Sequence, residues 1–120
     1  TKGELKMSAK FEIFHGKNDE FYFRLKAGNG QIILASEGYT TKANCQNGIK
    51  SVKSHAKESK YFEKKVTSNN KFSFNLKASN GQVIGSSQTY TTEQSRDAGI
   101  ASVGHNAPDA EVLDLTARPA

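Results

Sequence analysis

Acidic side chains recur at one position of this sequence, and paired carboxylates are a residue type that can do acid–base chemistry. Glu12, Glu63 and Asp114 follow one another at intervals of 51 residues. A glycoside hydrolase uses two facing carboxylates as its acid and base. Lys26 and Lys77 recur with the same interval, on the outward face of the strand expected to follow each glutamate. We therefore predict cross-strand ion pairs on a solvated face of a sheet, with a structural role for the acids.

A stripe of lysines is the second group that could bind a ligand. Its members are Lys42, Lys50, Lys53 and Lys57. The last three have the spacing i, i+3, i+7, which places them on one face of a helix. Residues 1–60 carry 11 Lys and Arg against 6 Asp and Glu, whereas residues 61–120 carry 6 of each kind. The stripe is a candidate contact for nucleic acid or another anionic partner, and a solvated helix face is the alternative.

The remaining candidates for catalysis or metal binding lack the neighbours that they would need. Cys45 falls on the apolar stripe of a helix, where free cysteine acts as a small buried side chain. The residue 51 positions after it is Arg96. His15, His55 and His105 are not kept from one copy to the next, and no H-x-x-x-H or C-x-x-C spacing occurs. We expect no catalytic residue, no metal site and no cofactor.

The elements that must position these residues come in two copies. Residues 11–56 align with residues 62–107 without a gap, and 21 of these 46 positions are identical. A repeat of this length is one supersecondary unit, and about 50 residues are marginally stable alone, so the copies should share a core. The copies differ where Leu34 becomes Gly85, which predicts a bulky neighbour or a close approach at that glycine.

Each copy contains a hairpin with clear strand and turn signals. In the first copy, residues 21–27 alternate apolar and polar side chains, which is typical of a half-buried strand. Asn29-Gly30 follows, and Asn-Gly between two strands predicts a two-residue type I′ turn. That turn pairs Leu25 with Leu34 on the buried face.

A helix follows each hairpin, from about Thr41 to Lys57 in the first copy. Its apolar stripe consists of Cys45, Ile49, Val52 and Ala56. In the second copy, Thr91 and Gln94 have the spacing of a capping box. Gly48 lies in the middle of the helix and is kept in the second copy, although glycine there costs about 1 kcal/mol relative to alanine. We expect close contact between helix and sheet at this position.

The first strand of the repeat occurs a third time after the second helix. Its three copies lie near Phe11, Phe62 and Leu113. We therefore predict an α+β fold, in which a duplicated unit of three strands, a helix and a strand forms one antiparallel sheet with both helices on one face and strands exchanged between the halves. The expected boundaries are a disordered tail over 1–10, a first repeat over 11–60, a second repeat over 61–116 and a tail over 117–120.

These motifs, in tandem, resemble the YegP-like family. The Asn-Gly hairpin, the helix start Tyr39-Thr-Thr-Lys42 and the stretch Gly48-Ile-x-Ser-Val52 carry the resemblance, which covers residues 10–116. The resemblance implies a small bacterial protein with an α+β fold and exchange of the strand after each helix. The family supplies no function and no catalytic residues to carry over.

Composition narrows the functional classes without naming a ligand. No apolar run approaches the roughly 18–20 residues of a membrane span, and a single cysteine fits a reducing compartment. We expect a cytoplasmic, non-enzymatic binding or interaction module, monomeric with internal pseudo-twofold symmetry, whose partner is a protein or a nucleic acid. One alternative is a weak polyanion binder that uses the basic first half. The other is an enzyme at the seam between the repeats, using the repeated acids or Tyr39 and Tyr90.

Overall fold

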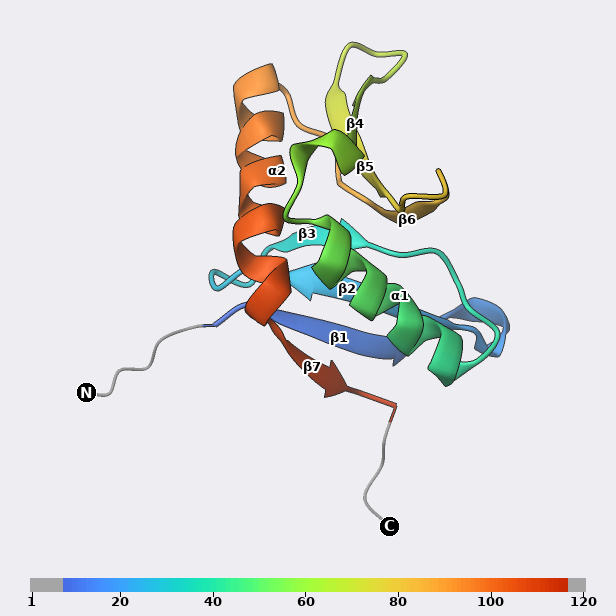
Figure 1. The fold of residues 1–120 in the computed structure, drawn as a ribbon. Helices are drawn as coiled ribbons and strands as arrows, with labels where there is room; N and C mark the ends of the chain where they lie inside the picture. The colour runs from blue at the N-terminus through green and yellow to red at the C-terminus, as the bar shows by residue number, and fades with distance from the viewer. Residues whose placement is uncertain (1–7, 117–120) are drawn as a thin grey trace, which may run out of the picture.

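The computed structural model describes residues 8–116, which form a seven-stranded sheet with two helices packed on one face (Figure 1). In chain order the elements are β1 (Lys10–His15), η1 (Lys17–Asp19), β2 (Phe21–Lys26), β3 (Ile32–Ala35), α1 (Lys42–His55), η2 (Ser59–Tyr61), β4 (Phe62–Val66), β5 (Phe72–Lys77), β6 (Val83–Ser86), α2 (Glu93–Asn106), η3 (Ala107–Asp109) and β7 (Glu111–Asp114). The predicted α+β fold is confirmed. Lys10 begins β1 and does not belong to a tail, while residues 1–7 and 117–120 of the expected tails lie outside the described residues.

The strand order is β4-β5-β6-β3-β2-β1-β7, with the seam between the repeats at β6 and β3. The strand after the second helix pairs with the other repeat, since β7 lies beside β1, whereas β4 lies beside β5 of its own repeat. The predicted exchange is therefore confirmed for β7. However, β7 runs parallel to β1, so the sheet is not antiparallel throughout as expected. Because β1 already occupies the place beside β2, the third strand of this type adds to the outer edge of β1.

The hairpins keep the predicted register at their centre but not at their turn. Leu25 lies opposite Leu34, as expected. A type I′ turn needs positive φ at two residues, whereas in this loop only Gly30 has it, at 86°. The Gly30 N–H donates to the carbonyl of Ala27, and the register shifts between Leu25 and Lys26. The loop is therefore longer than predicted and introduces a bulge.

Both helices begin at a threonine cap, and α1 buries the predicted stripe. The Thr41 side chain accepts a hydrogen bond from the Asn44 N–H, and Thr92 does the same in the second repeat. The capping box from Thr91 to Gln94 is therefore wrong by one residue. The buried stripe of α1 is Cys45, Ile49, Val52 and Ala56, as predicted. Neither helix within residues 8–116 is long and apolar enough to cross a membrane.

Two glycines leave space that large neighbouring side chains occupy in the core. A Cβ added at Gly48 would lie 2.5 Å from the hydroxyl of Tyr39, so the predicted close contact is made by a tyrosine that lies against α1. A Cβ added at Gly85 would lie 2.7 Å from two side-chain carbons of Leu34. The expected bulky neighbour of Gly85 is thus its own equivalent in the first repeat. The two positions meet at the seam, where one leucine fills the space for both.

Candidate ligand-binding groove

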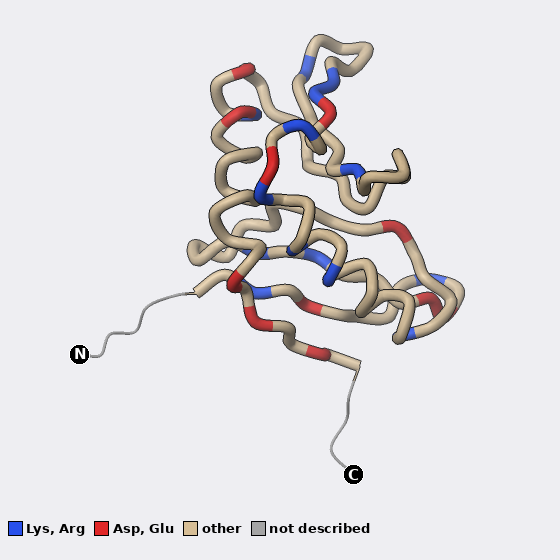
Figure 2. The backbone as a smooth tube through the Cα atoms, in the orientation of Figure 1, with Lys and Arg blue, Asp and Glu red and all other residues tan. Residues whose placement is uncertain are grey.

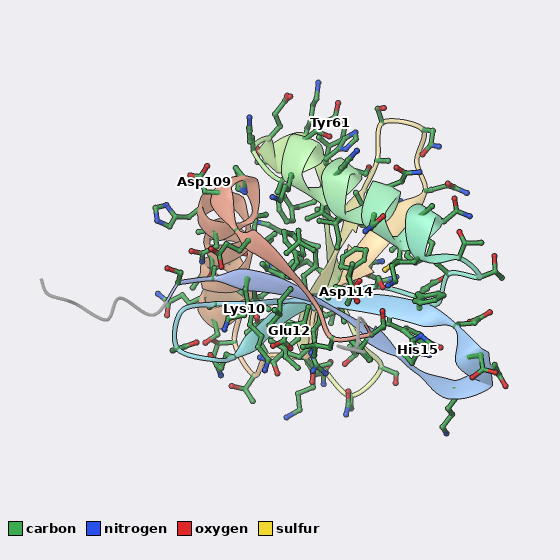
Figure 3. All side chains as sticks on the ribbon, turned by 90° about the horizontal axis from the view of Figure 1, so that it is seen from below. Lys10, Glu12, His15, Tyr61, Asp109 and Asp114 are labelled. Carbon is green, nitrogen blue, oxygen red and sulfur yellow. The ribbon has the colours of Figure 1, made fainter. Side chains whose placement is uncertain are left out.

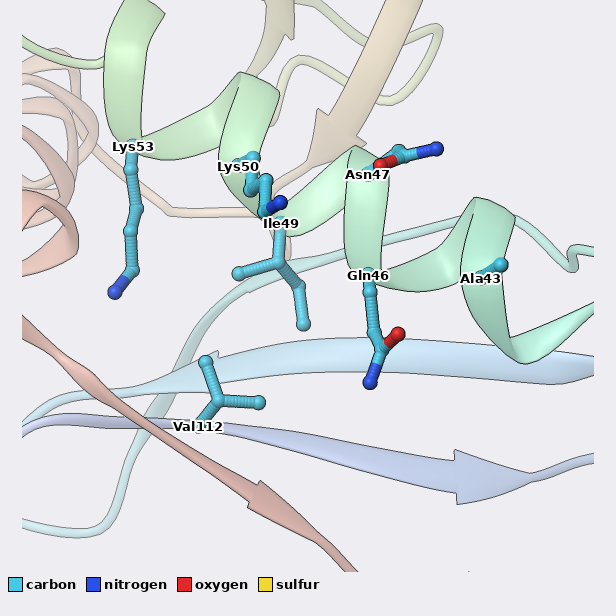
Figure 4. Close-up of a pocket in the computed structure, with 7 residues that line it drawn as sticks. All are labelled: Ala43, Gln46, Asn47, Ile49, Lys50, Lys53 and Val112. Atoms are coloured by element: carbon cyan, nitrogen blue, oxygen red, sulfur yellow. The ribbon is translucent and has the colours of Figure 1, made fainter.

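A groove between α1 and β7 brings two lysines of the predicted stripe beside apolar side chains (Figure 4). Its volume is about 440 Å³, and its lining residues are Ala43, Gln46, Asn47, Ile49, Lys50, Lys53 and Val112. Gln46, Lys50 and Lys53 emerge from the same side of α1 because residues three and four apart are neighbours on a helix. Val112 from β7 supplies exposed apolar surface, whereas Ile49 from α1 lies at the bottom of the groove and is almost fully buried. This combination suits an anion that carries an apolar part.

The four lysines of the stripe do not act as one group. Lys50 and Lys53 line the groove. The ammonium group of Lys42 lies 2.8 Å from the Asp114 carboxylate, so its charge is already matched by β7. Lys57 lies beyond the end of α1 and does not line the groove. Figure 2 shows basic positions along α1 and acidic positions along the neighbouring β7.

The position of β7 is fixed at both its backbone and its side chains. The Leu115 N–H donates to the carbonyl of Ile13 in β1 at 2.8 Å. The hydrogen bond from Lys42, followed by one from Thr116, lowers the pKa of Asp114 to about 2. This carboxylate therefore stays ionised and keeps the strand against the start of α1. The groove exists because this exchanged strand is held there.

The repeated glutamates form the predicted ion pairs. The Lys26 ammonium lies 3.3 Å from the Glu12 carboxylate, and that of Lys77 lies 3.3 Å from Glu63. Glu12 also accepts a hydrogen bond from Arg24 at 2.8 Å and is only 7% exposed. The Glu12 end of the first pair is thus buried, although the sequence predicted a solvated face, while the side chains of Lys26 and Arg24 remain 30% and 28% exposed.

The acids do not come together as a catalytic pair. Glu12 and Asp114 belong to the adjacent strands β1 and β7 (Figure 3). Asp114 is in register with Ile13, the residue after Glu12, so the two carboxylates point to opposite faces of the sheet. Burial by itself would raise the pKa of Glu12, but the hydrogen bonds from Arg24 and Lys26 outweigh it and hold that pKa below its usual value. Neither acid has the raised pKa that a general acid needs.

Cys45 and His55 have structural surroundings. Cys45 is fully buried, and this burial, with the Asp114 charge as a smaller contribution, raises the pKa of the thiol to about 11. A thiol of that pKa is a poor nucleophile at neutral pH. His55 Nδ1 lies 2.8 Å from the Ser51 carbonyl, while its Nε2 accepts from the Ser79 N–H at 3.1 Å. Over residues 8–116, no group of His, Cys, Asp and Glu gathers as a metal-ligand set.

The seam between the repeats is hollowed, but its hydroxyl groups are occupied. A hollow of about 440 Å³ is lined by Ile32, Leu34, Ala35, Ser36, Glu37, Ser86, Ser87 and Gln88. The Ser36 hydroxyl donates to the Glu37 carbonyl at 2.8 Å and accepts from the Phe23 N–H at 2.9 Å. Ser87 is bound in the same way in the second repeat. The repeated acids lie on β1, β4 and β7, so they do not line this hollow.

The sequence did not predict the roles of two residues, Val112 and Arg96. Val112 contributes to the groove only because β7 pairs with β1, and the third copy of the first strand was the signal for that pairing. Arg96 is 5% exposed, with its guanidinium 5.5 Å from the centre of the Phe72 ring and its Nε 3.2 Å from Asp97. Its place in the buried stripe, where the first copy has Cys45, was the available signal.

Comparison with known proteins gives the same repeat and fold. The family model described as "Domain of unknown function (DUF1508)" matches residues 17–63 and again 67–114. The UPF0339 protein YegP of Escherichia coli strain K12 is 51% identical over 110 residues, which cover 92% of this chain and all of that protein. A UPF0339 protein in the ptx operon 5′ region of Stutzerimonas stutzeri is 55% identical over 91% of this chain and 98% of its own.

Two solution NMR structures are also similar to this chain. That of E. coli YegP, titled a protein of unknown function, has a TM-score of 0.86 at 50% identity and covers 94% of this chain and 97% of its own. That of a UPF0339 protein of Shewanella oneidensis has a TM-score of 0.85 at 46% identity and covers 91% and 92%. These relatives are uncharacterised, in agreement with the expectation that the family supplies no function. With two matched repeats and relatives more than half identical over nine-tenths of its length, the chain belongs to the DUF1508 family and is similar to UPF0339 proteins, YegP among them.

Proposed function

We propose that the protein is a non-enzymatic binding module that holds an anionic ligand with an apolar part in the groove between α1 and β7. The observation that carries the proposal is the placement of Lys50 and Lys53 beside Val112, whose side chain is 45% exposed. The negative group of the ligand lies at the two ammonium groups, and its apolar part covers the floor.

The reactive groups of the chain support binding over catalysis. The Glu12 and Asp114 carboxylates are held ionised by cationic partners. The thiol of Cys45 is buried with a pKa of about 11. The Ser36 hydroxyl is already hydrogen-bonded to two backbone groups. A cytoplasmic monomer fits the proposal, since the single cysteine needs no oxidising compartment and the two repeats pair within one chain.

The groove favours a compact anion over a general polyanion. Lys42 is matched by Asp114, so the basic face available to a nucleic acid is shorter than the sequence suggests. In the second repeat, the residues equivalent to Lys50 and Lys53 are Ala101 and Gly104. The second repeat therefore has no equivalent pair of lysines.

NMR titration of the ¹⁵N-labelled protein tests this assignment. The probes are straight-chain carboxylates from acetate to octanoate, inorganic phosphate and a mixed-sequence single-stranded oligonucleotide, all at low salt. We expect shifts at Ile49 and Val112, with affinity that rises about fourfold for each methylene buried on the floor. Lys50→Ala and Lys53→Ala should each weaken binding. Lys65→Ala, which removes an equal charge from β4, is the matched control and should leave binding unchanged.

Two results would overturn the proposal. One is the absence of chemical-shift changes at the groove residues when any of the carboxylates is added at 10 mM. That concentration is on the order of the Kd of the weakest useful binding. The other is oligonucleotide binding that falls steeply with salt and that Lys57→Ala weakens as much as Lys53→Ala. The second result would identify a basic surface in place of a groove.

A further inference from the structure

The two repeats leave one strand position filled in the first half and open in the second. β1 and β4 occupy equivalent places, each beside the first strand of a hairpin. β7 then covers the outer edge of β1. Within residues 8–116, β4 pairs with β5 alone and forms the opposite end of the sheet (Figure 1). The edge of β4 is thus the counterpart of an edge that accepts a parallel strand.

The backbone of β4 presents the groups that such a strand needs. In β1, the carbonyl of Ile13 points outward and accepts the hydrogen bond from Leu115. The equivalent residue in β4 is Lys64. By the alternation along a strand, the N–H and C=O groups of Phe62, Lys64 and Val66 point away from β5. Unpaired groups at an edge are a template for strand addition.

Apolar side chains at this edge are only partly covered. Phe11 and Ile49, on the side where β7 lies, are 0% and 2% exposed. Their equivalents Phe62 and Ile100 are half-buried, and Val66 is 61% exposed. An aliphatic residue that lies beside β4 as Val112 of β7 lies beside β1 would cover Phe62 and Ile100.

The charge at the start of α2 is the reverse of that at the start of α1. Lys42, which fastens β7 through Asp114, is replaced in α2 by Glu93. The side chain of Glu93 is 68% exposed and lies 4.0 Å from Arg96, at the limit of an ion pair. Lys64, which is in register with that position as Ile13 is with Asp114, already pairs with Asp97 at 3.3 Å. A strand at β4 should therefore carry lysine or arginine where β7 carries aspartate, with Glu93 as the partner of that charge.

The same charges disfavour a second copy of this chain as the occupant. The β7 strand of another copy would bring Asp114 against Glu93, two like charges. Antiparallel pairing of two β4 edges would oppose Lys64 and Lys65 with their own copies, and lysines on an edge strand oppose such self-pairing.

We infer that the outer edge of β4 binds, in parallel, an extended segment of another protein with the pattern aliphatic, any residue, basic. The aliphatic side chain lies over Phe62 and Ile100, and the basic one pairs with Glu93. The backbone of the segment bonds Lys64 as β7 bonds Ile13. This site is separate from the groove of the proposed function, so either can fail without the other.

Two peptides and two variants test the inference. One peptide has the sequence of residues 110–116, and the other carries Asp114→Lys in that sequence. We expect the lysine peptide to shift the amides of Phe62, Lys64 and Val66 in the ¹⁵N spectrum and to bind about fivefold more tightly than the acidic one, the effect of one exposed ion pair. The variant Glu93→Lys should reverse this preference. It copies Lys42 at the equivalent helix position, so the fold should accept it.

The variant Lys64→Pro removes the outward N–H without a loss to the β5 ladder, and it should abolish binding of both peptides. Its amide spectrum outside β4 serves as the check of folding, and Glu93→Lys keeps the test decisive if this variant unfolds. Equal binding of both peptides by wild type and Glu93→Lys, or shifts confined to β1 and β7, would overturn the inference. Concentration-dependent dimerisation in sedimentation that Lys64→Pro removes would replace the peptide partner by a second copy.

Discussion

The pairing of Leu34 with Gly85 at the seam provides the sharpest test of the tertiary structure. Leu34 is fully buried, and a Cβ at Gly85 would lie 2.7 Å from its Cγ and Cδ2. Leu34→Ala empties this space, and Gly85→Ala intrudes on it. If one leucine fills the space for both positions, the two substitutions must compensate each other when combined.

The expected sizes follow from burial and contact. Leu34→Ala should lower the free energy of unfolding by about 3–4 kcal/mol, because a fully buried leucine leaves a cavity. Gly85→Ala alone should cost about 1 kcal/mol, since overpacking of roughly 2 kcal/mol exceeds the gain of about 0.5–1 kcal/mol from a less flexible unfolded chain. Gly85 does not have positive φ, so its backbone accepts alanine. In the Leu34→Ala background the clash is gone, and Gly85→Ala should instead stabilise by about 1 kcal/mol.

Thermal and urea unfolding of the four proteins measures the coupling. The cycle predicts a coupling energy of about 2 kcal/mol, and Leu34→Ala alone should lower Tm by about 12–16 °C at roughly 4 °C per kcal/mol. Gly85→Ala combined with Phe11→Leu, several strands away in the sheet, is the control and should be additive within about 0.5 kcal/mol. Additive effects for Leu34 and Gly85 would refute the packing at the seam.

Two further predictions concern the helices and the exchanged strand. Gly48→Ala should destabilise the protein by about 1–3 kcal/mol despite the better helix propensity of alanine, because its Cβ would lie 2.5 Å from the Tyr39 hydroxyl. Calorimetry should show that adding Tyr39→Phe restores part of the lost Tm. An unchanged or raised Tm for Gly48→Ala would contradict the close contact with Tyr39. Asp114 has a pKa of about 2 against an ordinary value of 3.8, so its stabilising contribution is present above about pH 4 and is lost as the pH falls toward 2. Asp114→Asn should therefore cost up to about 1 kcal/mol at pH 6 and progressively less as the pH falls from 4 through 2, and a difference from wild type that stays undiminished between pH 6 and pH 2 would count against the ion pair with Lys42.

Local patterns were sufficient where neighbours in sequence decide the structure. The interval of 51 residues gave the two hairpin-and-helix units, and the apolar spacing gave the buried stripe of α1. The ion pairs of Glu12 and Glu63 followed because a recurring acid and a recurring lysine on adjacent strands are cross-strand neighbours. Errors arose within one or two residues, at the turn before Gly30 and at the cap of α2, where backbone geometry selects among adjacent candidates.

The contacts of the lysine stripe could not be predicted from local spacing. Helical spacing placed Lys50 and Lys53 on one face, but it did not reveal that β7 would supply the opposite wall with Val112. Nor did it reveal that Lys42 would be matched by Asp114, 72 positions away in the chain. The sequence also counted a third copy of the first strand without determining on which side of the sheet it would pair.

By itself, the sequence determined the repeat, the α+β class and the buried faces, because each depends on periodicity and on residues close along the chain. Only the tertiary structure decided that β7 lies parallel to β1, that Leu34 fills the space of Gly85 and that the edge of β4 stays open among the described residues. These features depend on which of two equivalent places each element occupies. Two repeats of similar pattern give nearly the same local signal, so the choice between their places is made by packing across the whole molecule.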